Sequence, residues 1–135
     1  MMDKLIRIMP NKKVKVLIVD DDAFLSGIYA TKLELDGFEV ATARDGEEGL
    51  KVAMREKPDL ILLDVLMPKL DGFEVLKRLK ADDEMKAIPV IMLTNLGQKE
   101  DIEKGLQDGA VDYLIKAHFV PAEAVDKIKK VLNLP

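Results

Sequence analysis

Residues 14–19 read VKVLIV and run directly into Asp20, Asp21 and Asp22. A short, β-branched and mostly apolar run of this kind is typical of a strand buried on both faces of a parallel sheet. Four further apolar runs follow, at residues 38–42 (FEVAT), 60–63 (LILL), 90–93 (VIML) and 111–115 (VDYLI). Because helical patterns separate the five runs, we expect residues 14–19 to form the first strand of a parallel α/β sheet.

Each expected strand is followed by a segment in which apolar residues recur every three or four positions. The first of these stripes includes Tyr29 and Leu33. The second includes Leu50, Ala53 and Met54. Such a spacing predicts helices that turn one apolar face toward the sheet.

A few residues mark where these helices begin and end. Asp45 and Asp71 can cap helix N-termini, and Gly37 suits the end of a helix. Pro58 stops the second helix, and Pro121 suits the first turn of the last one. The pattern predicts a doubly wound (βα)5 flavodoxin-like three-layer sandwich, with a five-stranded parallel sheet of order 2-1-3-4-5. We assign residues 13–135 to this domain and residues 1–12 to a loose N-terminal extension.

The composition excludes several classes of protein. The chain has 135 residues, which suits a single domain. It contains no cysteine, so disulfide frameworks, thiolate metal sites and cysteine nucleophiles are excluded. The net charge of −4 argues against nucleic-acid binding, and no apolar run is long enough to cross a membrane. We therefore expect a cytoplasmic domain that binds neither nucleic acid nor membrane.

Charged and polar side chains stand where the predicted strands end. Residues 20–22 (DDD) follow the first strand and Asp64 follows the third, while Thr94 and Lys116 follow the fourth and fifth. Ligands of open α/β sheets bind beyond these ends, where the strand order reverses, here between the first and third strands. Neighbouring carboxylates repel one another, and Mg²⁺ relieves this because it prefers carboxylate oxygens. With an ammonium and a hydroxyl nearby, the set suits a phosphoryl group, which a carboxylate can accept as an aspartyl phosphate.

A purely structural explanation competes with this one. An aspartate after a strand is often only a helix N-cap or a turn residue, and Asp22 directly precedes the first predicted helix. Taken singly, Thr94 could satisfy its hydroxyl with the backbone, and Lys116 could be a solvated side chain. The structural explanation does not account for complementary groups at several strand ends together.

Four motifs stand in order on these strand ends, at residues 16–22 (VLIVDDD), 62–72 (LLDVLMPKLDG), 90–95 (VIMLTN) and 109–117 (GAVDYLIKA). Through them the chain resembles the receiver domain of response regulators in two-component signalling, of the stand-alone chemotaxis or phosphorelay type. The resemblance covers about residues 13–132. It implies a phospho-accepting switch rather than an enzyme, apart from self-phosphorylation and slow autodephosphorylation.

The resemblance also implies an acceptor and a metal site. Asp64 would accept the phosphoryl group. Asp21 would coordinate Mg²⁺ directly, and Asp20 would hold it mainly through water. Asp64 itself and the backbone carbonyl of Leu66 would be further metal ligands, and Mn²⁺ can substitute for Mg²⁺.

Three more residues would couple phosphorylation to a change of shape. The resemblance implies that Thr94 and Lys116 each bind a phosphoryl oxygen, and that Tyr113 turns inward when Thr94 moves. The phosphoryl group would come from a histidine kinase or a histidine phosphotransfer protein. The face formed by the fourth helix, fifth strand and fifth helix would then change its preference for an output protein, as a monomer or as a phosphorylation-dependent dimer.

The chain departs from the family pattern beside Lys116 and at two apolar positions. Ala117 replaces the usual proline, and a cis bond before a residue other than proline costs about 3 kcal/mol, so we expect a trans bond there or a cis bond held at a cost. Leu66 and Leu96 stand two positions past the acceptor and the threonine. Two bulky apolar side chains there would hinder an attacking water, so we expect slow autodephosphorylation.

Two other functions stay open. A phosphatase of the haloacid dehalogenase kind forms its aspartyl phosphate on the first residue of an Asp-x-Asp pair, and Asp20 and Asp22 have that spacing. However, Phe24 stands where that pattern has Thr or Val, and there is no cap segment. A receiver-like binding module that is never phosphorylated would share the fold, and the Lys116-Ala117 pair keeps this alternative open.

Overall fold

One parallel sheet forms the centre of the protein, whose computed structural model describes residues 13–94, 99–116 and 120–135. Its five strands lie in the order β2-β1-β3-β4-β5, which confirms the predicted topology. The strands are β1 (Lys15–Val19), β2 (Glu39–Ala43), β3 (Leu60–Asp64), β4 (Val90–Thr94) and β5 (Asp112–Ile115). Each begins and ends within one residue of its predicted bounds. The predicted N-terminal extension, residues 1–12, lies outside the described residues.

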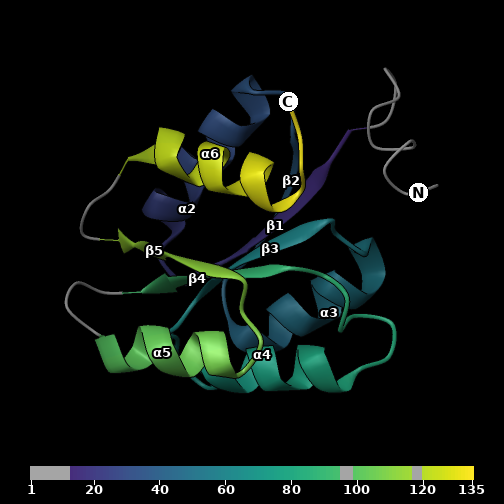
Figure 1. Cartoon of the computed structure of the whole chain (residues 1–135), viewed down its shortest axis with the longest axis vertical. Helices are drawn as coiled ribbons and strands as arrows, with labels where there is room; N and C mark the ends of the chain where they lie inside the picture. Colours follow the sequence, from purple (N-terminus) through teal and green to yellow (C-terminus); the bar gives the residue numbers. More distant parts are fainter. Residues whose placement is uncertain (1–12, 95–98, 117–119) are drawn as a thin grey trace.

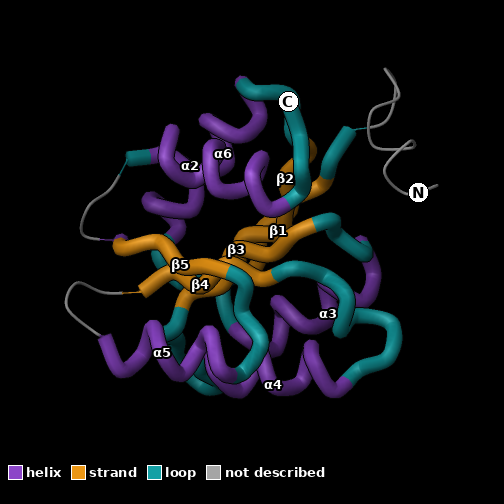
Figure 2. Tube along the Cα trace, in the orientation of Figure 1, coloured by secondary structure: helices purple, strands orange, loops and turns teal. Residues whose placement is uncertain are grey.

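Helices cover both faces of the sheet (Figure 1). They are α2 (Ala23–Leu35), α3 (Gly46–Glu56), α4 (Gly72–Ala81), α5 (Lys99–Gln107) and α6 (Pro121–Val131). Helices α2 and α6 lie on one face, and α3, α4 and α5 lie on the other, so the sheet is the middle of three layers (Figure 2). Within the described residues, no helix is long and apolar enough to cross a membrane.

Strand β1 shows why an almost wholly apolar sequence forms the centre of this sheet. Its side chains alternate between the two faces. Val16 and Ile18 belong to the core under α2 and α6, whereas Leu17 and Val19 belong to the core under α3 and α4. Each of the four is at most 1% exposed. Burial of both faces is the reason why this strand carries no polar alternation.

The predicted helix starts are confirmed. The side chains of Asp22, Asp45 and Asp71 each accept a hydrogen bond from the backbone amide three residues later, at 2.8–3.0 Å. Helix α6 begins instead with Pro121 after Val120, which offers no side-chain cap.

The prediction that Met54 faces the core is wrong. Met54 of α3 is 53% exposed, whereas Ala53 is buried. The buried face of α3 is formed by Gly49, Val52 and Ala53, at the i, i+3, i+4 spacing, and Met54 lies off this face. A side chain added at Gly49 would collide with Val19, so small residues let α3 pack closely on β1.

Candidate functional site

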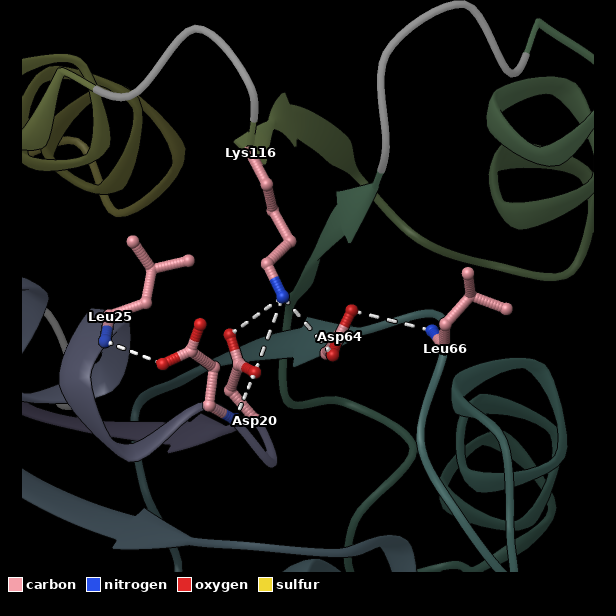
Figure 3. A network of polar contacts seen from close by, with 6 residues as sticks. Asp20, Leu25, Asp64, Leu66 and Lys116 are labelled. Atoms are coloured by element: carbon pink, nitrogen blue, oxygen red, sulfur yellow. Dashed lines mark hydrogen bonds and ion pairs between the residues drawn. The ribbon is translucent and has the colours of Figure 1, made fainter.

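Three charged residues meet at the carboxyl ends of the strands (Figure 3). Asp20 follows β1 and Asp64 ends β3, and these strands are paired with Val19 opposite Leu63. Lys116 follows β5 and reaches across β4 to both carboxylates. The topology therefore brings together residues that are 44 to 96 positions apart in sequence. This is the strand-order switch point at which the sequence predicted a site.

Lys116 forms ion pairs with both aspartates. Its Nζ lies 3.2 Å from Oδ2 of Asp20 and 3.3 Å from Oδ2 of Asp64. Asp20 is 1% exposed and Asp64 is 3% exposed. Asp20 Oδ1 also accepts from the Asp22 amide at 2.9 Å, which couples the first helix to the site. One partly buried ammonium thus faces two buried carboxylates, and the site retains an excess of negative charge.

Burial and this excess charge change the protonation of the site. Burial, together with the neighbouring Asp20 carboxylate, raises the pKa of Asp64 to about 7, although Lys116 and the Leu66 amide act in the opposite direction. Burial alone would lower the pKa of Lys116, but the Asp64 and Asp20 carboxylates outweigh it and raise that pKa above its ordinary value. The lysine therefore stays an ammonium while Asp64 titrates near neutral pH.

The carboxylates fit a hard divalent cation. Oxygens of Asp20, Asp21 and Asp64 all lie within 4.8 Å of one another, and Asp21 is exposed to solvent. Within the described part of the chain, Oδ2 of Asp20 accepts no hydrogen bond, although it is paired with Lys116. An all-oxygen donor set with one solvent-facing member is what Mg²⁺ prefers, because this ion retains several waters. A bound cation would also relieve the repulsion that raises the Asp64 pKa.

Thr94 offers a hydroxyl beside this cluster. It ends β4, one residue beyond Leu93, which pairs with Asp64 of the neighbouring strand. The residue is 2% exposed, and its Oγ1 finds no hydrogen-bond partner among the described residues. An unsatisfied buried hydroxyl costs about 1–3 kcal/mol. An oxygen of a group bound at Asp64 would satisfy it.

The loop after β3 shapes the backbone around Asp64. The Leu66 amide donates to Oδ1 of Asp64 at 3.3 Å, and the Gly72 amide donates to the Val65 carbonyl at 2.8 Å. A Cβ built on Gly72 would overlap the main-chain carbonyl oxygen of Asp64. Glycine is therefore required at this position by close backbone approach rather than by its own φ.

We expect Gly72→Ala to lower the free energy of unfolding by about 1–3 kcal/mol, because the new methyl group has to displace the backbone at Asp64. Gly27→Ala is the matched control: Gly27 lies inside α2 and a Cβ there meets nothing within 4 Å. That substitution should stabilise the protein by about 0.5–1 kcal/mol. Urea denaturation of both variants measures the difference, and equal stabilities would contradict the assigned role of Gly72.

Among the described residues, the side chains of Tyr113 and Leu66 take no part in the ion pairs of the cluster. Tyr113 is half-buried on β5 and packs against the core under α3 and α4. Leu66 is 61% exposed, so its side chain is free to face solvent beside the acceptor. Leu96, and the Lys116-Ala117 peptide bond whose isomer was an open question, lie outside the described residues.

Two buried polar residues of α2 were not predicted to belong to the site. Tyr29 is 2% exposed, and its burial, followed by the nearby charges of Asp20 and Glu123, raises its pKa to about 12. Ser26 is 5% exposed, and its Oγ has no hydrogen-bond partner within the described residues. Their spacing of three on a helix that starts beside Asp20 was the available signal. Both residues lie among the apolar residues of the first helix, so the sequence pattern indicated only a place in the core.

Comparison with known proteins agrees with this geometry. Residues 16–129 match the response regulator receiver domain family. The chain is 46% identical over 119 residues to the alkaline phosphatase synthesis transcriptional regulatory protein PhoP of Bacillus subtilis, covering 88% of this chain and 48% of that protein. It is 42% identical over 119 residues to the DNA-binding dual master transcriptional regulator RpaA of Synechocystis, covering 88% of this chain and 49% of RpaA. The chain therefore spans about half the length of these relatives.

A solved structure supports the same assignment. The chemotaxis response regulator CheY4 of Vibrio cholerae superimposes with a TM-score of 0.82 at 34% identity, covering 88% of this chain and 98% of that one. The fold, the acidic cluster and the sequence of this chain together show that it belongs to the response regulator receiver domains, the phospho-accepting switches of two-component signalling.

Proposed function

We propose that Asp64 accepts a phosphoryl group in a Mg²⁺-dependent reaction, from a histidine kinase or a histidine phosphotransfer protein. The observation that carries this proposal is the pairing of Lys116 with both buried carboxylates. One ammonium between two aspartates leaves a carboxylate oxygen available and a fixed positive charge beside it. Asp20, Asp21 and Asp64, with the Leu66 carbonyl, would hold the ion, and Mn²⁺ can replace it.

The chemistry follows from these positions. A carboxylate oxygen of Asp64 attacks phosphorus as the bond from phosphorus to the donor nitrogen breaks, and the leaving imidazole keeps that electron pair. Lys116 neutralises one phosphoryl oxygen and Thr94 donates its hydroxyl to another. When bound, Mg²⁺ supplies charge neutralisation at the same oxygens. The Leu66 amide, already at 3.3 Å from Oδ1 of Asp64, is placed to donate to the product.

Intact mass spectrometry tests this proposal with the purified chain, a small acyl phosphate and Mg²⁺. We expect a gain of about 80 Da in the wild-type protein. The gain should be absent in Asp64→Asn and after chelation of the metal. No gain in the wild type would instead favour a binding module that is never phosphorylated.

An apolar surface on α2 is available to the partner that carries the histidine. A shallow groove of about 610 Å³ runs along α2 to Pro121, and its lining includes Phe24, Ile28 and Leu35. Phe24 and Leu35 are each 78% exposed, which is unusual for such large apolar side chains. Phe24 comes two residues after Asp22, whose amide donates to Asp20, and Asp20 shares Lys116 with the acceptor. A helix docked at Phe24 would therefore bring its histidine toward Asp64.

We expect Phe24→Ala to slow phosphotransfer from a histidine phosphotransfer protein about tenfold, because an exposed aromatic anchor is lost. Phosphorylation by a small acyl phosphate should not change, since that donor needs no docking surface. Met54→Ala removes a side chain that is 53% exposed on α3, on the opposite face of the sheet, and is the control. A similar slowing with both donors would contradict the docking role of Phe24.

The lifetime of the phosphorylated form depends on access of water to Asp64. The side chain of Leu66 is apolar and exposed. The backbone amide of Leu66 donates a hydrogen bond to the Asp64 carboxylate. We expect Leu66→Asn to shorten this lifetime several-fold, because an amide can orient a water that leucine cannot. Leu35→Asn changes an exposed leucine of α2 instead and should leave the lifetime unaltered. An equal or longer lifetime in Leu66→Asn would contradict the tuning role.

The output of the switch would pass through the face formed by α5, β5 and α6. Two packings of this face, shifted in population by phosphorylation, would differ in affinity for the output protein. The same face would serve a phosphorylation-dependent dimer. Its central residue is Tyr113, which we expect to turn inward as Thr94 moves toward the phosphoryl group.

A further inference from the structure

A cluster at the outer edge of the sheet connects α6 to Tyr113. We call Asp112, Tyr113 and Lys127 the β5 edge cluster. Lys127 Nζ lies 3.0 Å from Oδ2 of Asp112 and 5.5 Å from the centroid of the Tyr113 ring. The other carboxylate oxygen of Asp112 accepts from the Tyr113 amide at 2.8 Å. Two side chains therefore hold the aromatic residue, one at its backbone and one over its ring.

The strand geometry makes this arrangement specific to the edge of the sheet. Strand β5 is the last strand of the sheet, and successive side chains point to opposite faces. Leu114 packs into the core under α2 and α6, whereas Tyr113 packs against the core under α3 and α4. Lys127, which belongs to α6, must therefore reach around the free edge of β5 to cover the ring. Lys127 contacts Asp112 and the Tyr113 ring, whose side chains point to opposite faces of the sheet. These two contacts together resist movement of the tyrosine ring.

The ion pair of this cluster is sheltered compared with those on the helix surfaces. Its side chains are 25% and 26% exposed, against 55% and 41% for Arg78 with Glu74. Partial burial weakens screening by solvent and salt. A cation over an aromatic face adds a further attraction. The two contacts together are expected to favour the observed ring position about fivefold over a position without them.

We propose that Lys127 is a positioning residue that keeps the Tyr113 ring at the sheet edge in the unphosphorylated protein and so opposes its inward turn. The inference rests on the proposed function, in which that turn accompanies phosphorylation of Asp64. It assigns to α6 a part in setting the basal population of the activated form. Loss of the lysine charge should release the ring without any change at the acceptor site.

The two tyrosines of this chain provide a direct measurement. The sequence has only Tyr29 and Tyr113, so protein labelled with fluorotyrosine gives two ¹⁹F resonances, and Tyr29→Phe identifies them. In the unphosphorylated Lys127→Met protein, we expect the Tyr113 resonance to move toward its position in the phosphorylated wild type. The inward population should rise about fivefold, and phosphorylation by acyl phosphate should become faster by a similar factor.

Matched variants separate the role of the charge from a general effect on α6. Lys127→Arg keeps the cation and should behave as the wild type, whereas Asp112→Asn should shift the resonance in the same direction as Lys127→Met but less far. Lys130→Met changes an exposed lysine of the same helix and should have no effect.

The experiment separates the role of Lys127 from phosphorylation of Asp64. A wild-type chain that is phosphorylated on Asp64, with the same Tyr113 resonance in Lys127→Met as in the wild type, overturns the role of Lys127 alone. An equal shift in Lys130→Met overturns it as well. A wild-type chain that never takes a phosphoryl group overturns both proposals.

Discussion

Lys116→Met is expected to lower the free energy of unfolding by about 3 kcal/mol at pH 8 without Mg²⁺. The substitution leaves Asp20 and Asp64, which are 1% and 3% exposed, without their shared cation. The loss should become smaller toward pH 5, because protonation of Asp64 then removes the repulsion. The rate of phosphorylation by acyl phosphate should fall about 100-fold, since a fixed positive charge beside the transferred group is gone.

A double-mutant cycle checks this interpretation. Asp64→Asn should rescue much of the stability of Lys116→Met, which would give a coupling of about 2 kcal/mol between the two positions. Lys51→Met, on the exposed face of α3, should change neither stability nor phosphorylation. Additive effects of Lys116→Met and Asp64→Asn in urea denaturation would contradict the shared ion pair.

Asp64→Asn is expected to stabilise the metal-free protein by about 2–4 kcal/mol at pH 8 and by little at pH 4. The pKa of Asp64 is about 7 in the folded protein, so the folded state binds this proton more tightly than the unfolded chain does. The wild type therefore loses stability as the pH rises from about 4, the pKa of an unperturbed aspartate, to about 7. Asparagine at position 64 removes this contribution.

The measurement is urea denaturation of both proteins between pH 4 and pH 8. Their difference isolates residue 64 from the other carboxylates, which both proteins share. At pH 8, Mg²⁺ at ten times its Kd should raise the free energy of unfolding of the wild type by about 1.4 kcal/mol, and that of the variant by less. A difference that stays constant with pH would show that burial and Asp20 do not raise the Asp64 pKa.

The order of elements could be predicted because local signals agreed with the tertiary fold. Asp22, Asp45 and Asp71 each combine a cap with the start of an apolar stripe, and strand β1 is buried on both faces. Met54 was placed in the core wrongly, since its apolar character alone does not tell on which side of α3 it lies. Small residues such as Gly49 define the buried face of that helix, and they carry little signal of their own.

Much of the candidate site could also be predicted, because parallel strands bring their carboxyl ends to one edge. Asp20, Asp64 and Lys116 meet as the topology requires. The β5 edge cluster could not be predicted in this way, since Lys127 was indistinguishable from the other lysines of a solvated helix face. Its role depends on a reach around the edge of the sheet, which only the packing of α6 on β5 defines.

Identifying the phosphorylated residue tests directly whether Asp64 is the acceptor. The chain is treated with acyl phosphate and Mg²⁺, reduced with borohydride so that an aspartyl phosphate becomes homoserine, and sequenced by tandem mass spectrometry after digestion. We expect homoserine at position 64 and at no other aspartate. Homoserine at position 20, as the phosphatase alternative requires, would contradict it.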